Sequence, residues 1–374
     1  MVLIELGLIF VGLALLYRTA YYLGFSPIPF ILLAGLAFGE GGIVPLRFSE
    51  SFVQVTAEIG SLLLLFMLGL EYSGQELREA LQAHLPDGLV DVLLNFLPGF
   101  LLAVGMGWSL PLAVLMGGAT LITSSGILAH LIAELRLEEL PEARIAVSIS
   151  VLEDMLVALL LPPAAALIFH AESSMAGPLL LTTLLSIGAL WTAIRFGQAL
   201  SRAVDHESDG VLLLSLFGLV LLAGGIATLL QIPAAISGFL LGIAISDPVK
   251  ERARRLIGPV RDLSATVFFL TLGLRLDPGL LPPVLPLAGG LVLITGFTKW
   301  LTGWWAARRQ RLGRWARWRT GALMVARGEL SGVIAGLVLQ AMPSAPFVPL
   351  TAAYVLLSAI IGPLLVHLVP RTKP

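Results

Sequence analysis

The stretch Ser150-Val151-Leu152-Glu153-Asp154-Met155-Leu156 places two adjacent carboxylates inside an apolar run from about Ala146 to Ile168. The run is long enough to cross a bilayer, because roughly 20 apolar residues in a helix span the ~30 Å hydrocarbon layer. Glu153 and Asp154 fall near its middle, where a charged side chain costs at least about 2.5–3.5 kcal/mol. Two such charges need compensation by water, a counter-charge, a proton or a cation. The stretch therefore predicts a membrane helix in which Asp154, assisted by Glu153, binds a cation in exchange for protons.

The composition of the whole chain agrees with a protein that crosses the membrane many times. Of its 374 residues, 57% are hydrophobic and 13% are charged, with a mean hydropathy of +0.94. Soluble domains carry about 25% charged residues. A net charge of −1 indicates no nucleic-acid partner, and the absence of cysteine excludes thiol chemistry. The five histidines lack metal-site spacing, and the buried polar residues include no nucleophile–base pair, so we expect neither an enzyme nor a cofactor.

Hydropathy, with glycine, proline and charge as punctuation, predicts an all-α protein with about thirteen transmembrane helices. They are expected over 2–18, 25–39, 52–70, 88–107, 109–134, 143–170, 177–200, 210–229, 232–247, 258–275, 284–307, 318–341 and 347–369. With the N-terminus outside, 17 of the 23 lysines and arginines fall in inside loops or the C-terminal tail, and two, Arg47 and Arg275, fall outside. This bias predicts a cytoplasmic C-terminus. We expect an integral protein of a prokaryotic cytoplasmic membrane. The first apolar segment is interpreted as a retained helix.

An internal repeat is visible at an offset of 204 residues. Phe66-Met67-Leu68-Gly69-Leu70-Glu71 matches Leu270-Thr271-Leu272-Gly273-Leu274-Arg275, and Ile28-Pro29 matches Ile232-Pro233. The first six helices would then correspond to the last six in inverted orientation, with 177–200 as the connector. Inverted repeats place a substrate site near the membrane midplane, between broken helices. Chance recurrence of short Leu-Gly-Leu and Ile-Pro motifs is the simpler alternative.

The fifth helix of each expected repeat carries polar residues at mid-depth. Thr123-Ser124-Ser125-Gly126 interrupts one helix, and Arg327-Gly328-Glu329-Leu330 interrupts the other. Glycine and hydroxyl residues are found where a membrane helix unwinds, so we expect two broken helices that cross and aim helix dipoles and free carbonyls at one point. Alternatively, the hydroxyls of Thr123 and Ser124 bond back to the preceding turn of an unbroken helix.

The buried charges divide the chain into an apolar scaffold and a polar core. Scaffold or dimerisation helices are expected over 1–75 and 210–275, and core helices over 86–170 and 284–370, with a connector over 177–200. The core holds Asn95, Thr123, Ser124, Glu153, Asp154, Lys299, Arg327 and Glu329. Three carboxylates then face two cations, and the surplus carboxylate would take up a proton or a cation. Asp91, near the start of its expected span, is assigned to the membrane interface.

Alternative functions follow from the same residues. A static ion-pair network would need no transport role for these charges. A cation channel would need a continuous pore. A transporter of organic anions on a related inverted-repeat fold would use Lys299 and Arg327 as binding groups. Carboxylate, hydroxyl and carbonyl oxygens suit both Na⁺ and K⁺, so the ligand types rank neither ion.

Several motifs together resemble the membrane domain of the Kef-type branch of the monovalent cation:proton antiporters. The resemblance covers nearly the whole chain and rests on these stretches: Leu62–Glu71, Thr123-Ser124-Ser125, Leu152-Glu153-Asp154, Gly238-Phe239-Leu240-Leu241-Gly242, Phe268–Gly273 and Ala326-Arg327-Gly328-Glu329. The family usually has Gln-Asp, Asn-Asp or Asp-Asp where this chain has Glu153-Asp154. The departure leaves both electroneutral and electrogenic exchange open.

The resemblance implies a homodimer joined through the scaffold helices, with a core that moves in an elevator-like step. It implies that Asp154 binds Na⁺, K⁺ or H⁺, that Lys299 neutralises Glu153, and that no cofactor takes part. Thr123 and Ser124 are expected to help Asp154 bind the cation, and Arg327 and Glu329 to balance each other's charge. A nucleotide-binding domain typical of many relatives is absent from this sequence, so regulation would need a cytoplasmic domain or subunit outside this chain. Membrane lipid is the remaining expected partner, around the arginine-rich segment 308–319.

Overall fold

The computed structural model describes residues 2–23, 25–39, 41–42, 50–71, 74–169, 188, 195–229 and 234–370, and these residues form helices and short connections without a strand. The helices are α1 (Val2–Tyr22), α2 (Pro27–Phe38), α3 (Glu50–Glu71), α4 (Gly74–Gly105), α5 (Leu110–Leu121), α6 (Ser125–Leu135), α7 (Pro141–Phe169), α9 (Asp209–Leu229), α10 (Ala234–Ala244), α11 (Val249–Leu274), the 3₁₀ turn η1 (Pro278–Leu280), α12 (Leu281–Arg309), α13 (Arg314–Leu323), α14 (Glu329–Ala341) and α15 (Phe347–His367). Residues 195–204 are also helical.

Twelve of the thirteen expected apolar segments coincide with these helices, and two of them are each divided into a pair of half-helices. The remaining segment, 177–200, lies mostly outside the described residues. Among the described residues, six helical segments have the length and apolarity to cross a membrane, and five shorter helices are apolar as well. The all-helical membrane architecture is confirmed, whereas the count of thirteen crossings stays a prediction.

Two helices begin much earlier than hydropathy predicts. α4 begins at Gly74 rather than 88, and α11 begins at Val249 rather than 258. Both extensions are rich in charged residues, as in Lys250-Glu251-Arg252-Ala253-Arg254-Arg255. Such a segment is helical with one buried face, here including Ala253 and Ile257. A criterion based on continuous apolarity therefore detects only the membrane-embedded part of each helix.

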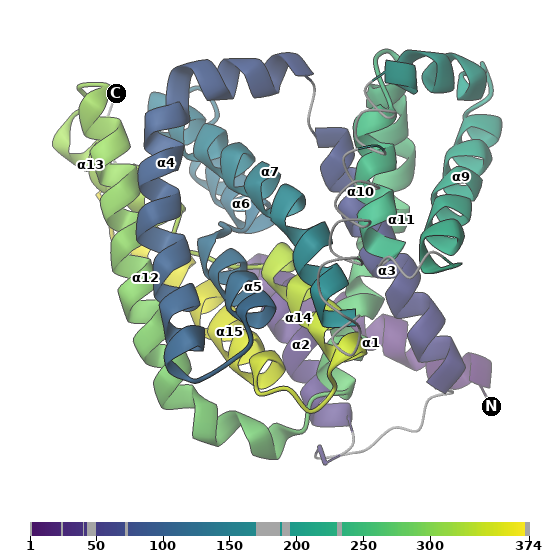
Figure 1. Cartoon of the computed structure of the whole chain (residues 1–374), viewed down its shortest axis with the longest axis horizontal. Coiled ribbons are helices and arrows are strands. Elements are labelled where there is room, and N and C mark those ends of the chain that lie inside the picture. Colours follow the sequence, from purple (N-terminus) through teal and green to yellow (C-terminus); the bar gives the residue numbers. More distant parts are fainter. Residues whose placement is uncertain are drawn as a thin grey trace.

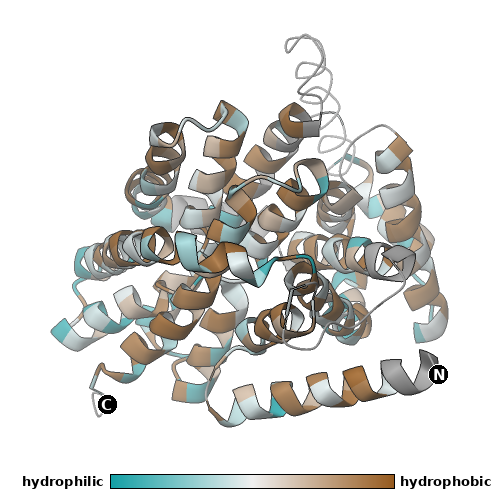
Figure 2. Ribbon diagram, turned by 90° about the horizontal axis from the view of Figure 1, so that it is seen from below, coloured by the Kyte–Doolittle hydropathy of each residue, from teal (hydrophilic) through white to brown (hydrophobic). Residues whose placement is uncertain are grey.

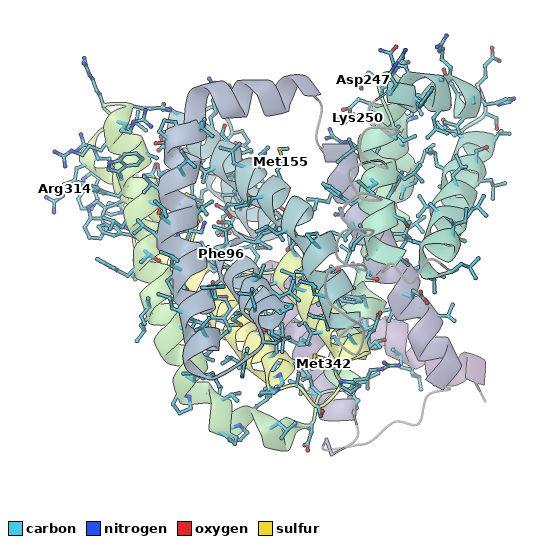
Figure 3. All side chains as sticks on the ribbon, in the orientation of Figure 1. Phe96, Met155, Asp247, Lys250, Arg314 and Met342 are labelled. Carbon is cyan, nitrogen blue, oxygen red and sulfur yellow. The ribbon has the colours of Figure 1, made fainter. Side chains whose placement is uncertain are left out.

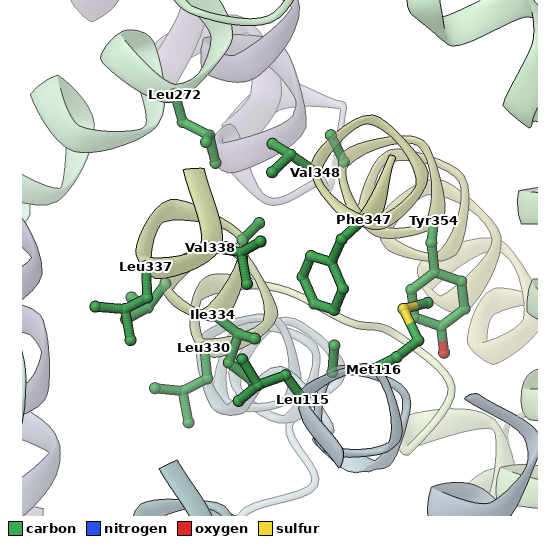
Figure 4. Close-up of a cluster of buried hydrophobic side chains, with 14 of the residues drawn as sticks. Leu115, Met116, Leu272, Leu330, Ile334, Leu337, Val338, Phe347, Val348 and Tyr354 are labelled. Atoms are coloured by element: carbon green, nitrogen blue, oxygen red, sulfur yellow. The ribbon is translucent and has the colours of Figure 1, made fainter. Parts of the chain in front are cut away.

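The helices form two groups that meet at the centre of the molecule. Figure 1 shows α4, α12 and α13 on one side and α3, α9, α10 and α11 on the other, with α5, α7, α14 and α15 between them. Apolar residues predominate over the ribbon, and α1 runs along one edge (Figure 2). The half-helix α14 packs Leu330, Ile334 and Val338 against Leu115 of α5 and Phe347 of α15 (Figure 4).

Glycine pairs fix two of the helix crossings. A Cβ atom on Gly35 of α2 would lie 2.7 Å from the Cα of Gly273 in α11, and one on Gly69 of α3 would lie 2.9 Å from the Cα of Gly242 in α10. Any larger residue would separate these helices, because side-chain atoms do not approach backbone so closely. Both crossings join the N-terminal and the C-terminal parts of the chain.

A close contact between a glycine and an aromatic ring occurs twice, and the two occurrences are 204 residues apart in the sequence. A Cβ atom on Gly117 of α5 would meet the ring of Phe96 in α4, 2.7 Å away. A Cβ atom on Gly321 of α13 would meet the Trp300 indole in α12, also 2.7 Å away. Each residue of the second pair lies 204 positions after its counterpart in the first, since 300 − 96 and 321 − 117 both equal 204. The offset found in the sequence motifs is therefore also an offset between contacts.

Candidate ion-binding site

Two helix breaks cross and bond to each other. α5 ends at Leu121 and α6 begins at Ser125, with extended backbone at Ile122 and Ser124. α13 ends at Leu323 and α14 begins at Glu329. The amide of Ser124 donates to the carbonyl of Ala326 at 2.9 Å, which joins the two unwound segments. The two predicted helix breaks are thus confirmed.

Local chemistry explains where the first break falls. The Ser124 hydroxyl accepts from the amide of Ile127 at 3.2 Å, as an N-cap of α6. The Thr123 hydroxyl lies 3.2 Å from both Glu153 Oε1 and the carbonyl of Met324. Neither hydroxyl bonds back to the preceding turn, which excludes the unbroken-helix alternative. Gly328 lies in the second break, facing Ser124. Only glycine fits there, because a Cβ atom would collide with the Ser124 side chain.

Lys299 of α12 lies between two buried carboxylates. Its Nζ atom is 2.6 Å and 2.7 Å from the two oxygens of Asp91 and 2.8 Å from Glu153 Oε1. Glu153 also accepts from the backbone amide of Thr123. The side chains of Lys299 and Asp91 are 0% exposed and that of Glu153 is 1% exposed. The expected contact between Lys299 and Glu153 is present.

The assignment of Asp91 to the membrane interface is wrong. Because α4 starts at Gly74, Asp91 lies well inside the helix, where it is fully buried against α12. The sequence held a usable signal, since Asp87, Asp91 and Asn95 are spaced four residues apart and share one helix face. With Asp91 included, four core carboxylates face two cations, so the surplus is two negative charges rather than one.

Asn95 joins three helices next to this ion pair. Its amide nitrogen donates to Asp91 Oδ1 at 2.9 Å and to Thr302 at 3.3 Å, and its amide oxygen accepts from Thr298 at 2.7 Å. Its backbone carbonyl accepts from the Thr120 hydroxyl at 2.9 Å. Asn95 therefore orients Asp91 and connects α4 with α5 and α12.

Arg327 and Glu329 do not pair with each other, contrary to expectation. Arg327 is fully buried and donates to the carbonyls of Thr120, Met324 and Val325 at 2.9–3.0 Å. These carbonyls lie at the C-terminal ends of α5 and α13, which have lost their helical partners at the breaks. One guanidinium thus caps two helix C-termini, where the macrodipole favours positive charge.

Glu329 lies at the N-terminal ends of the other two half-helices, α6 and α14. Its carboxylate accepts from the Ser124 hydroxyl at 2.7 Å, the Ser125 hydroxyl at 3.0 Å and the amide of Gly126 at 2.9 Å. These groups begin α6, and Glu329 itself begins α14. The carboxylate therefore lies at two helix N-termini, which favour negative charge. The charges of Arg327 and Glu329 are balanced by the four half-helix ends instead of by each other.

Asp154 faces a different environment from Glu153. Its side chain is 2% exposed and lines a narrow cavity of about 10 Å³, and one water molecule needs about 10–15 Å³. The other lining residues are all apolar: Leu65 and Leu68 of α3, Val157 and Leu161 of α7, Ile236 and Phe239 of α10, and Leu330, Val333 and Ile334 of α14. Of the residues expected at the same site, the Thr123 hydroxyl lies 3.2 Å from Glu153 Oε1 and the Ser124 hydroxyl donates to Glu329 at 2.7 Å.

Comparisons with known proteins show the family to which the chain is related. A family profile described as sodium/hydrogen exchanger, transmembrane, matches residues 7–369. The K⁺/H⁺ antiporter subunit KhtU of Bacillus subtilis is 31% identical over 371 residues, covering 96% of this chain and 91% of that protein. The ammonium/H⁺ antiporter subunit AmhT of Alkalihalophilus pseudofirmus is 28% identical, covering 90% and 85% respectively.

A similar fold is known from an archaeal protein. The structure of the sodium proton antiporter MjNhaP1 from Methanocaldococcus jannaschii superposes with a TM-score of 0.70 at 18% identity, covering 98% of this chain and 97% of that one. The predicted resemblance to cation:proton antiporters is confirmed, and the relatives are transporters rather than enzymes. The chain belongs to the sodium/hydrogen exchanger family of transmembrane proteins.

Proposed function

We propose that this chain exchanges Na⁺ or K⁺ for protons by alternating access, with Asp154 as the site that the cation and the proton share. The observation that carries the proposal is a carboxylate buried among apolar side chains at the junction of α3, α7, α10 and α14. An ionised carboxylate is costly in such surroundings unless it is protonated or holds a cation. Alternation between these two states is the chemistry of antiport.

The neighbouring charges support a change of occupancy at Asp154 rather than at another residue. Arg327 and Glu329 are bound to helix ends, and Lys299 is bound to Asp91 and Glu153. The same contacts weigh against an organic-anion transporter, because Lys299 and Arg327 already bind acceptors of the protein.

The cavity at Asp154 also supports movement of a core against a scaffold. Leu65, Leu68, Ile236 and Phe239 come from α3 and α10, and the remaining lining residues come from α7 and α14. A displacement of α7 and α14 past α3 and α10 would change the side from which Asp154 is reached. The repeated glycine contacts support two inverted six-helix repeats as the basis of this movement. In this proposal the N-terminus is outside, the C-terminus is cytoplasmic, and scaffold helices join a homodimer.

The relatives guide the choice of substrate and partner. KhtU and AmhT are named as subunits of a K⁺/H⁺ and an ammonium/H⁺ antiporter. The monovalent cations in these names, K⁺ and ammonium, are therefore the first to test. The word subunit in both names supports a partner subunit for this chain, and no cofactor is part of the proposal.

The test is proton flux in sealed proteoliposomes that contain a trapped pH dye. Addition of Na⁺ or K⁺ should move protons with the wild-type chain, and Asp154→Asn should abolish the signal. Asp205→Asn, which changes an exposed carboxylate of the same type, is the matched control and should retain exchange. Clamping the membrane potential shows whether the exchange is electrogenic. Undiminished exchange in a folded Asp154→Asn protein would refute the role of Asp154.

A further inference from the structure

The outer face of α12, α13 and α15 carries an apolar cavity of about 660 Å³. All of its lining residues are apolar, and among them are Phe297, Trp300, Trp315, Trp318 and Leu365. The rings of Trp300 and Trp318 lie 4.7 Å apart, and Phe297 stacks on Trp300 at 6.1 Å. Phe297, Trp315 and Trp318 are also exposed at the surface, so the cavity opens towards the surroundings of the protein.

A second cavity, of about 770 Å³, adjoins the first and is basic. The two cavities share Trp315, Leu368, Val369 and Pro370 in their walls. Arg136, Arg314, Arg319, His367 and Glu142 line the second cavity. Arg319 and Glu142 bind each other at 2.7 Å and cancel in charge. Arg136 and Arg314 have no ion pair with the described residues, and Arg314 lies at the outer edge of the molecule (Figure 3).

We infer that the two cavities form one binding site for an anionic phospholipid. The apolar cavity would receive an acyl chain, and the guanidinium groups of Arg136 and Arg314 would bind the headgroup phosphate, as arginine does through paired hydrogen bonds. Charge complementarity selects an anionic lipid over a zwitterionic one. The inference rests on the membrane setting of the family and is independent of the role proposed for Asp154.

The apolar cavity also reaches the second helix break, where α13 ends at Leu323. Ala322 and Val325 line the apolar cavity, and Val325 supplies one of the carbonyls bound by Arg327. A lipid chain packed here would brace the half-helix that enters the second break.

Native mass spectrometry of the whole purified chain tests the inference. The chain is titrated with phosphatidylglycerol and, separately, with phosphatidylcholine. We expect Arg136→Gln/Arg314→Gln to weaken phosphatidylglycerol binding about tenfold or more, since each basic residue near an anionic headgroup strengthens binding roughly fivefold. The matched control is Arg308→Gln/Arg311→Gln, which removes the same charge from the same basic region outside both cavities. Each pair includes one residue with positive φ, Arg136 (54°) or Arg311 (61°), so the two double variants are matched in backbone conformation as well as in charge.

A further variant tests the acyl-chain cavity. A Cβ atom on Gly296 would lie 3.5 Å from Val325 in ordinary contact, so Gly296→Leu should fold and fill the cavity. It should weaken phosphatidylglycerol binding, and Gly289→Leu, which faces open space in the same helix, should not. Equal binding of phosphatidylcholine, equal losses in both arginine pairs, or full binding by Gly296→Leu would overturn the inference. Stronger quenching of tryptophan fluorescence by brominated phosphatidylglycerol than by brominated phosphatidylcholine in the wild-type chain would support it without a variant.

Discussion

At the scale of single residues, Lys299 is the buried cation that bridges two buried carboxylates. Its removal leaves Asp91 and Glu153 close together without a counter-charge. We expect Lys299→Met to destabilise the protein by about 3–5 kcal/mol, the usual cost of breaking a buried ion pair. The loss is measured as a fall in the midpoint of thermal unfolding in detergent.

Neutralising the carboxylates should reverse part of that loss. Asp91→Asn combined with Lys299→Met removes one of the two stranded charges, so the double variant should be more stable than Lys299→Met alone. Arg309→Met is a suitable comparison, because it breaks an ion pair with Asp87 in which the arginine is partly exposed. It should lower the stability of the protein less than Lys299→Met does. A double variant that is no more stable than Lys299→Met would show that Lys299 and Asp91 do not depend on each other.

At the scale of elements, the crossing of the two breaks requires Gly328. A Cβ atom at this position would collide with the Ser124 side chain and separate the unwound segments. We therefore expect Gly328→Ala to abolish cation-evoked proton flux in proteoliposomes and to lower the unfolding temperature. Gly289→Ala in α12 should leave both unchanged, because its Cβ atom would contact nothing within 4 Å. Normal flux from Gly328→Ala would mean that the observed crossing is not needed for transport.

The breaks themselves were predictable from the sequence, but the partners of their charges were not. Small and hydroxyl residues at mid-depth in two helices indicate unwinding, and the repeat offset related the two positions. The pairing of Arg327 with Glu329 was inferred from formal charge alone. Helix ends also carry partial charge, about half an elementary charge each, and two ends together can balance a full ionic charge. The sequence does not indicate which carbonyls meet at a crossing, because that depends on the tertiary fold.

The position of Asp91 was missed for a related reason. Hydropathy locates the apolar part of a helix, whereas α4 continues through a polar segment to Gly74. A residue that seems to lie near a helix start is then in its interior. The pairing of Lys299 with Glu153 is instead implied by the resemblance to the antiporter family, and the two side chains are in contact at 2.8 Å.

At the scale of the whole molecule, the proposed movement predicts which parts must separate during transport. The wild-type chain contains no cysteine, so pairs of cysteines can be introduced directly. Leu68→Cys with Val333→Cys would join α3 to α14 across the Asp154 cavity. Linking this pair with a bifunctional thiol reagent should stop cation-evoked proton flux, and transport should return when a cleavable reagent is reduced.

The control for this experiment lies within the proposed scaffold. Tyr17 of α1 and Thr266 of α11 are in contact, with their hydroxyl oxygens 3.0 Å apart. Cross-linking Tyr17→Cys to Thr266→Cys should leave transport unchanged if α1 and α11 move together. Equal inhibition by both cross-links would contradict a division into a moving core and a fixed scaffold.

The most direct test of the central claim is proton release from the purified protein when a cation binds. In weakly buffered detergent solution with a pH dye, at a pH where Asp154 is protonated, addition of Na⁺ or K⁺ should release protons from the wild-type chain. Asp154→Asn should release none, and Asp205→Asn should match the wild type. Cation binding without proton release, or release that persists in a folded Asp154→Asn protein, would contradict a site shared by the cation and the proton at Asp154.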